Sequence, residues 1–163
     1  RVCRFSCFSL KCNWRQKVIG LDKVLPQKNI NKINSFPFSN FIKLIKGSST
    51  NPLIVKEVKK NIPKNSKVMV ILDSNHTTEH VSEELKIYSE LVSKDSYLIV
   101  CDTILNFIPN QKHRLRKFNK SDNPKIALDN FLKNCTKFEV DNYFNNKVLT
   151  TYSPTGFLKK IKT

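Results

Sequence analysis

Two apolar segments that each end in an aspartate constrain this chain more than any other feature. Residues 68–72 read V-M-V-I-L and lead into Asp73, and residues 97–101 read Y-L-I-V-C and lead into Asp102. Runs of this kind are typical of strands buried on both faces, and the segment between them, 78–92, has the apolar spacing of a helix. The order strand, helix, strand predicts parallel neighbours in a sheet, and ligands bind beyond the carboxyl ends of such strands. We therefore expect Asp73 and Asp102 to meet at one edge, where two carboxylates could hold a divalent cation.

The rest of the chain also predicts alternating strands and helices. Strands are expected at 17–22, 41–45, 138–140 and 147–152, and helices at 27–35, from 52 to 61 and from 124 onward. Ser49, Thr50 or Asn51 can cap the helix that begins at Pro52, because proline suits a first helical turn. This pattern indicates an α/β fold with a mostly parallel sheet, helices on both faces and an antiparallel edge. The long segment 104–122 is expected to be a loop that covers a site.

The composition is typical of a soluble globular protein. A length of 163 residues with 39% hydrophobic residues suits one domain. The sequence has no apolar run near the roughly 20 residues that span a bilayer. We assign residues 17–163 to a single domain and leave residues 1–16 unassigned. Five cysteines without the C-x-x-C spacing of a zinc or redox site favour a reducing, cytoplasmic setting.

The formal net charge of +16 raises the hypothesis of a nucleic-acid or polyanion binding module. Lysines are scattered through every predicted element, however, and the chain is also rich in asparagine and isoleucine. This pattern favours a general compositional bias over a basic binding face, so nucleic acid is not the expected partner. The densest basic segment, 112–120, falls in the long loop, where it could contact an anionic substrate.

Several segments, taken together, resemble one known family. They are V-I-G-L-D (18–22), G-S-S-T-N-P (47–52), V-I-L-D-S-N-H-T-T-E-H-V (70–81), Y-S-E-L-V-S-K-D-S-Y-L-I-V-C-D-T (88–103), N-P-K-I-A-L-D-N-F-L (123–132) and L-T-T-Y-S-P-T-G-F-L-K (149–159). Over residues 17–161 this succession resembles the cephalosporin hydroxylase family, which is also described as rhamnosyl O-methyltransferase-like. The resemblance implies a Rossmann-like class I methyltransferase fold, S-adenosylmethionine as cofactor and a divalent metal, Mg²⁺, near the acceptor hydroxyl.

The resemblance also implies which residues bind the cofactor. Asp22, at the end of its strand, matches the acid that accepts hydrogen bonds from a ribose diol, and a turn or helix cap is the alternative. Gly47, Ser48 and Ser49 could lie against the adenine or the ribose through backbone and hydroxyl contacts, or they could serve only as a helix cap. Asp73 is expected beside the cofactor as well.

The implied metal ligands are Asp73 and Asp102, because both match acidic positions of the family and Mg²⁺ requires hard oxygen ligands. The family usually has two consecutive acids before the threonine, and here the first of them is Cys101. A thiol is a poor ligand for Mg²⁺. Cys101 in the ligand set therefore predicts weaker Mg²⁺ binding and makes softer metals such as zinc conceivable.

Two histidines follow Asp73. His76, three residues later, is expected at the mouth of the same cleft, where it could take a proton from the acceptor hydroxyl or complete the metal sphere. His80 lies four residues further on, roughly one helical turn, so the pair could share a face and a catalytic role. The alternative for both is a helix cap or a bond to the backbone.

A glycine-rich loop, typical of class I methyltransferases, is missing before Asp22, and the chain begins with arginine. We therefore expect the carboxyl-terminal part of a longer protein. The first strand of this fold lies between strands 17–22 and 67–73, and its absence would leave central backbone groups unpaired. Residues 2–8 could fill the gap as a substitute strand. For residues 1–16 the alternatives are a helix remnant, a membrane-binding segment and a sequence artefact.

These observations predict an incomplete methyltransferase domain. At full length it would transfer a methyl group from S-adenosylmethionine to a hydroxyl of a sugar, a glycolipid or a related small molecule, as in lipid biosynthesis. Catalysis would depend mainly on positioning, with the metal lowering the pKa of the acceptor and a base removing its proton. A nucleic-acid or polyanion binding module and a noncatalytic remnant are the competing hypotheses. A homo-oligomer is left open.

Overall fold

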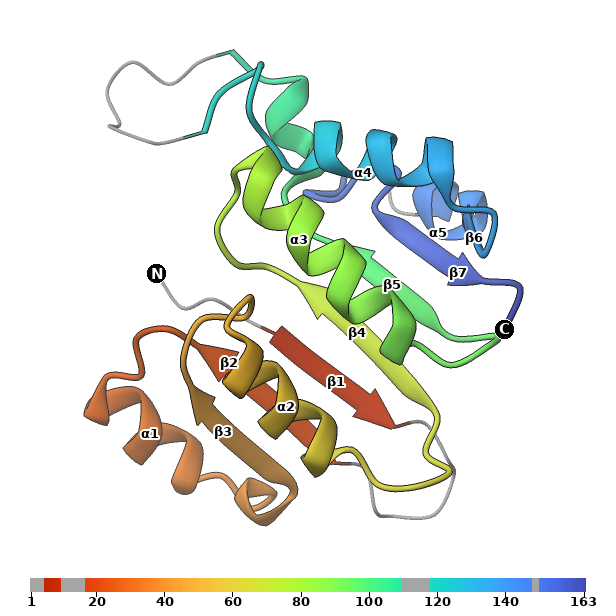
Figure 1. Ribbon diagram of the computed structural model, residues 1–163. Helices are drawn as coiled ribbons and strands as arrows, with labels where there is room; N and C mark the ends of the chain where they lie inside the picture. Colours follow the sequence, from red (N-terminus) through yellow and green to blue (C-terminus); the bar gives the residue numbers. More distant parts are fainter. Residues whose placement is uncertain (1–4, 10–16, 110–117, 148–149) are drawn as a thin grey trace.

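A seven-stranded sheet in the order β3-β2-β1-β4-β5-β7-β6 organises the chain in a computed structural model that describes residues 5–9, 17–109, 118–147 and 150–163 (Figure 1). The strands are β1 (Phe5–Ser9), β2 (Val18–Asp22), β3 (Ile42–Lys46), β4 (Val68–Leu72), β5 (Tyr97–Val100), β6 (Phe138–Val140) and β7 (Phe157–Lys160). The helices are α1 (Gln27–Asn34), α2 (Pro52–Asn61), α3 (Thr78–Tyr88), α4 (Pro124–Asn134) and α5 (Asn142–Lys147), with 3₁₀ turns at Ser39–Phe41, Ser89–Leu91 and Thr103–Asn106. The predicted Rossmann-like α/β class is confirmed.

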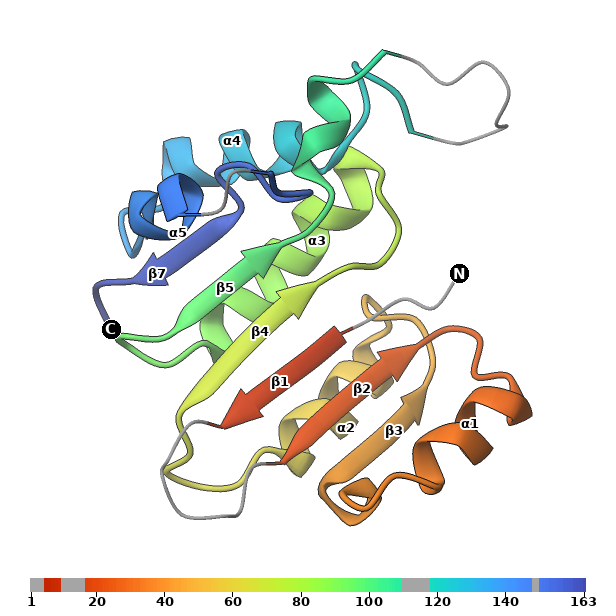
Figure 2. The ribbon, with the colours of Figure 1, turned by 180° about the vertical axis from the view of Figure 1, so that it is seen from behind.

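Parallel pairing joins β2 to β3 and β4 to β5, as the alternation of strands and helices predicts. Connections between parallel strands are almost always right-handed, so the direction of each crossover decides the face on which its helix packs. The crossovers place α2, α3 and α4 on one face of the sheet and α1 on the other. Figure 1 shows α2 and α3 in front of the strands, and Figure 2, seen from behind, shows the strands in front of these helices.

The centre of the sheet is occupied by β1, which is antiparallel to both of its neighbours, β2 and β4. Of the alternatives open for this part of the sequence, the substitute strand is the one observed. Only residues 10–17 separate β1 from β2, and a connection of that length suits an antiparallel pair, whereas parallel neighbours need a crossover of a dozen residues or more. Through β1, the inner edges of β2 and β4 have backbone partners.

The antiparallel edge lies at the opposite end of the sheet from β3, where β7 pairs with both β5 and β6. The strand predicted at 147–152 is wrong. Residues up to Lys147 belong to α5, residues 148–149 lie outside the described residues, and 150–152 form no strand. The edge strand is Phe157–Lys160 instead, because the bend at 153–156 returns the chain antiparallel to β5.

Two helices begin as the sequence predicts, each at an asparagine followed by a proline. The side chain of Asn51 accepts a hydrogen bond from the backbone N–H of Leu53, and Asn123 accepts from Lys125 and Ile126. Such caps satisfy N–H groups that have no partner within the helix. Among the described residues, none of the helices has the length and apolar character required to cross a membrane.

The hydrophobic core lies between the sheet and the layer formed by α2, α3 and α4. Seven of its described residues have no exposed surface: Val58, Val70, Leu85, Tyr88, Leu98, Leu128 and Leu158. On β4, Val68, Val70 and Leu72 face this core, whereas Met69 and Ile71 point to the other face and are partly exposed. In the described part of the chain, that other face carries no helix over its middle strands (Figure 2).

Gly156 sits where the 153–156 bend approaches β5 most closely. Its carbonyl accepts a hydrogen bond from the backbone N–H of Val100, and its own N–H donates to Ser153. A Cβ atom at this position would overlap the carbonyl oxygen of Val100, which is backbone and cannot move aside as a side chain can.

We predict that Gly156→Ala lowers the free energy of unfolding by about 1–3 kcal/mol, because overpacking against backbone forces the chain apart. Urea unfolding followed by circular dichroism measures the loss. Gly20→Ala is the matched control, since a Cβ there would lie 3.1 Å from the mobile side-chain end of Leu44. Equal stability of the two variants would contradict the close approach assigned to Gly156.

Candidate functional site

Two acids meet at the carboxyl ends of neighbouring parallel strands, as the sequence predicts. Asp73 follows β4 directly, and Asp102 follows β5 after one intervening residue, Cys101. The register pairs Leu72 with Val100, and the backbone N–H of Cys101 donates to the carbonyl of Leu72 at 2.9 Å, so the strands stay together to their ends. The sheet therefore delivers both carboxylates to one edge.

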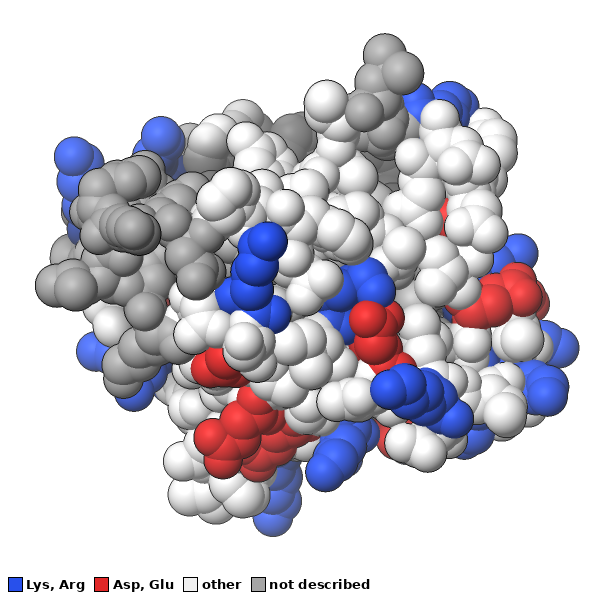
Figure 3. Space-filling model, turned by 90° about the horizontal axis from the view of Figure 1, so that it is seen from above, with Lys and Arg blue, Asp and Glu red and all other residues white. Residues whose placement is uncertain are grey.

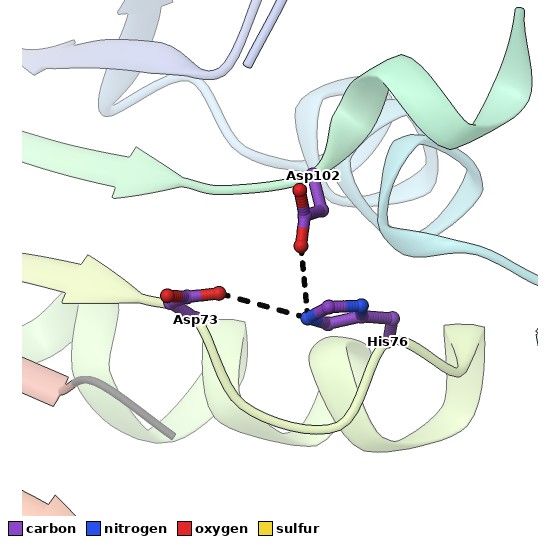
Figure 4. A group of neighbouring side chains, drawn as sticks. All are labelled: Asp73, His76 and Asp102. Carbon is purple, nitrogen blue, oxygen red and sulfur yellow. Dashed lines mark ion pairs between the residues drawn. The ribbon is translucent and has the colours of Figure 1, made fainter. Parts of the chain in front are cut away.

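His76 lies beside these two acids, and the three residues Asp73, His76 and Asp102 form a cluster. Nε2 of His76 lies 3.1 Å from Oδ2 of Asp102 and 3.6 Å from Oδ1 of Asp73, and Figure 4 shows the ring pointing between the two carboxylates. One ligand atom from each of the three side chains falls within 4.8 Å of the others, a spacing that could hold a metal ion. All three side chains are partly exposed, so a ligand can reach them.

The backbone of Asp102 adopts a left-handed conformation, with φ of 57°. Aspartate visits this region more readily than most residues, but the conformation still has a cost. The cluster geometry accounts for it here, since this turn ends β5 and places the carboxylate against His76.

Cys101 lies outside the group of side chains whose ligand atoms come together. Burial raises the pKa of its thiol to about 12, and the negative charge of Asp73 acts in the same direction. A thiol with this pKa is protonated at neutral pH, and metals bind the thiolate. The structure thus brings His76, and not Cys101, to the two acids.

The other sequence-predicted residues line a separate pocket at the same edge of the sheet. Its walls come from the ends of β2, β3 and β4 and from α3, and they comprise Leu21, Asp22, Lys23, Gly47, Ser48, Ser49, Ser74, Asn75, His80 and Glu84. Ser74 and Asn75 lie between Asp73 and His76 in the sequence, so the pocket and the cluster adjoin through one loop.

The two carboxylate oxygens of Asp22 differ in their hydrogen bonding. Oδ1 accepts the backbone N–H of Val24 at 2.9 Å, which closes the turn after β2. Oδ2 is buried and has no hydrogen-bond partner in the described part of the chain. A buried carboxylate oxygen without a partner is costly. A bound ligand that donates a hydrogen bond would remove this cost.

His80 belongs to the pocket and not to the cluster. Its Nε2 lies 3.1 Å from Oγ of Ser49 and 3.5 Å from Oε1 of Glu84. The pKa of His80 is raised, chiefly by its hydrogen bond with Glu84, although burial acts against this. The expected shared face with His76 does not form, because His76 precedes the first residue of α3, so helical spacing does not relate the two.

Glu84 is a pocket residue that the sequence-predicted site does not include. It is only 1% exposed, and it accepts a 2.6 Å hydrogen bond from Ser74. Its spacing of four residues from both His80 and Tyr88 is the signal that could have placed it, since these positions share a helix face.

Phe118 packs against the cluster from the far end of the long loop. Its ring centroid lies 5.1 Å from that of His76, in a tilted arrangement. Nearby, Asp122 accepts the backbone N–H of Thr78 at the start of α3. The described end of the loop is therefore fixed beside the cluster, while residues 110–117, with most of the basic segment, lie outside the described residues.

Comparison with known proteins agrees with this architecture. Residues 4–161 match the family described as rhamnosyl O-methyltransferase/CmcI. The chain is 32% identical over 118 residues to proteins named rhamnosyl O-methyltransferase from Mycobacterium tuberculosis (strain ATCC 25618 / H37Rv) and Mycobacterium bovis (strain BCG / Pasteur 1173P2). These matches cover 70% of this chain and 45% of each relative, so the chain spans about half the length of the curated relatives. Because the family match extends over nearly all of its residues, the chain belongs to the rhamnosyl O-methyltransferase/CmcI family.

Proposed function

We propose that this chain is the S-adenosylmethionine-binding and metal-binding part of an O-methyltransferase that acts on a hydroxyl of a sugar or glycolipid. The observation that supports this most strongly is the adjacency of two features: a pocket with an open buried carboxylate oxygen, and a cluster of Asp73, His76 and Asp102 beside it. Family membership supports the methyl-transfer chemistry, and the names of the relatives support a sugar acceptor.

The pocket suits the nucleoside end of the cofactor. Oδ2 of Asp22 can accept a hydrogen bond from a ribose hydroxyl, as the acid at this place does in related nucleotide-binding folds. Ser48 and Ser49 offer hydroxyl groups to the ligand. The backbone N–H of Gly47 donates to the carbonyl of Asp22, which fixes this part of the pocket wall. A Cβ atom at Gly47 would collide with the side chain of Ile54.

The donor set of the cluster suits a divalent cation. Asp73 and Asp102 would each supply a carboxylate oxygen and His76 an imidazole nitrogen, and a metal held there would lower the pKa of an acceptor hydroxyl bound to it. Nε2 of His76 lies at hydrogen-bond distance from Asp102, which orients the ring. If the two aspartates held the metal without His76, the imidazole would be in place to accept the proton of the hydroxyl.

The described charges on one face of the molecule do not favour the polyanion hypothesis. On the face shown in Figure 3, lysine and arginine side chains are dispersed among neutral and acidic residues and do not form one continuous patch. The groups that line the pocket are mostly neutral or acidic, with Lys23 as the cation among them. A chain that binds neither the cofactor nor a metal would instead be a noncatalytic remnant.

We predict that this chain binds S-adenosylhomocysteine and that Asp22→Asn weakens the binding by about 10-fold to 100-fold, because a hydrogen bond to a buried charged acceptor is lost. Isothermal titration calorimetry measures both affinities. Asp129→Asn is the control, since this half-exposed carboxylate on α4 lies outside the pocket and pairs with Lys125 on the same helix. Absence of binding by the wild-type chain would refute the cofactor assignment.

We also predict that the cluster binds Zn²⁺ and Co²⁺ more tightly than Mg²⁺, since imidazole is a better ligand for these metals than for Mg²⁺. His76→Asn should reduce the preference for Zn²⁺ over Mg²⁺ by about 10-fold or more. Asp73→Asn should weaken the binding of all three metals. Calorimetry with each ion gives the affinities. Glu79→Gln serves as the control, because Glu79 is exposed and outside the cluster. An unchanged preference in His76→Asn would remove His76 from the ligand set.

A further inference from the structure

One face of α3 carries three polar side chains at intervals of four residues: His80, Glu84 and Tyr88. Each contacts a residue in a loop that forms the pocket. We infer that this polar stripe is a positioning device that holds the loops after β3 and β4 at the separation that the nucleoside pocket requires. The inference depends on the proposed function for the identity of the ligand, but not for the existence of the device.

The stripe holds Ser49, in the loop after β3, at two points. The hydroxyl of Tyr88 donates to the carbonyl oxygen of Ser49 at 2.6 Å, and His80 Nε2 lies 3.1 Å from its hydroxyl oxygen. Tyr88 has no exposed surface, and Ser49 is only 7% exposed. Backbone and side chain of Ser49 are therefore both fixed, which leaves its hydroxyl in a defined place on the pocket wall.

The same stripe holds Ser74, in the loop after β4. The hydroxyl of Ser74 donates to Oε2 of Glu84 at 2.6 Å, and the other oxygen of Glu84 faces His80. Glu84 thus connects the two loops through one buried carboxylate. Because a buried charge is tolerated only when it is paired and hydrogen-bonded, every member of this network depends on the others.

The sheet cannot set the separation of these loops by itself. β3 and β4 are not neighbours, since β2 and β1 stand between them in the strand order. No ladder of hydrogen bonds joins the two strand ends directly. A single helix that contacts both loops supplies the constraint. A binding site whose groups are already fixed loses less conformational entropy when the ligand binds.

Hydrogen exchange tests the device without any ligand. We expect Glu84→Gln and Tyr88→Phe to raise amide exchange at least 10-fold in residues 47–51 and, for Glu84→Gln, in residues 73–76. The matched control is Glu79→Gln, an exposed glutamate on the same helix outside the polar stripe. If Glu84→Gln does not fold, Ser74→Ala removes the same hydrogen bond from the loop side. Unchanged exchange in Tyr88→Phe and in whichever of Glu84→Gln and Ser74→Ala folds would overturn the inference.

Ligand binding supplies a second, separable readout. The affinity for S-adenosylhomocysteine should fall at least 5-fold in His80→Gln and by more in Ser49→Ala, which also removes a hydroxyl offered to the ligand. The double variant should bind no more weakly than Ser49→Ala, because without the Ser49 hydroxyl the change at His80 has no contact left to remove. Additive losses would overturn the role of that contact. If the wild-type chain binds no S-adenosylhomocysteine while the exchange results stand, the proposed function fails and the positioning device does not.

A dependence on pH distinguishes the stripe from ordinary packing. Glu84 and Glu83 on α3 raise the pKa of His80, while Lys23 and burial lower it, and the net shift is upward. A raised pKa in the folded state stabilises the fold fully below the unfolded value of about 6.5 and no longer does so once the pH has risen through the folded value. The protection of residues 47–51 from amide exchange should therefore weaken as the pH rises from about 6.5 through the raised pKa of His80. Glu84→Gln should flatten this dependence, and a wild-type profile without it would contradict the contribution of His80.

Discussion

The parallel register of β4 and β5 is the constraint on which the rest of the site depends. It brings the ends of two strands together and carries Asp73 and Asp102 to the same edge. The left-handed turn at Asp102 then directs the second carboxylate toward the first loop, where His76 meets both acids. Had the two strands run antiparallel, their carboxyl ends would lie on opposite edges, and the three side chains could not converge.

One helix links the two halves of the site. The loop that leads into α3 carries the histidine of the cluster, and the body of α3 carries the polar stripe that contacts the pocket. Both halves therefore share a rigid element whose adjacent face is packed in the core through Val81 and Leu85. The proposed reaction between a cofactor and an acceptor would need a fixed separation of the two, and a common support of this kind would provide it.

Local sequence signals predicted the strands and helices that have strong patterns. They failed where tertiary contacts determine which segment forms a strand or which side chain is buried. The asparagine and proline pairs marked the starts of α2 and α4 correctly, because capping is a property of a few neighbouring residues. The segment 147–152 has β-branched residues typical of a strand, yet β5 pairs with Phe157–Lys160 instead. Glu84 is absent from the predicted site because its contacts with Ser74 and His80 come from the folded arrangement and not from the apolar period of the helix.

The sequence by itself determined the α/β class, the convergence of Asp73 and Asp102 and the family, because apolar runs, helix caps and motif residues are local and carry their own information. Only the tertiary structure decided that His80 belongs to the pocket, that Cys101 stays out of the cluster and that β1 lies antiparallel in the middle of the sheet. The physical reason is the same in each case. The direction in which a side chain or a strand points depends on which partners, far away in sequence, satisfy its hydrogen bonds, and no local pattern specifies those partners.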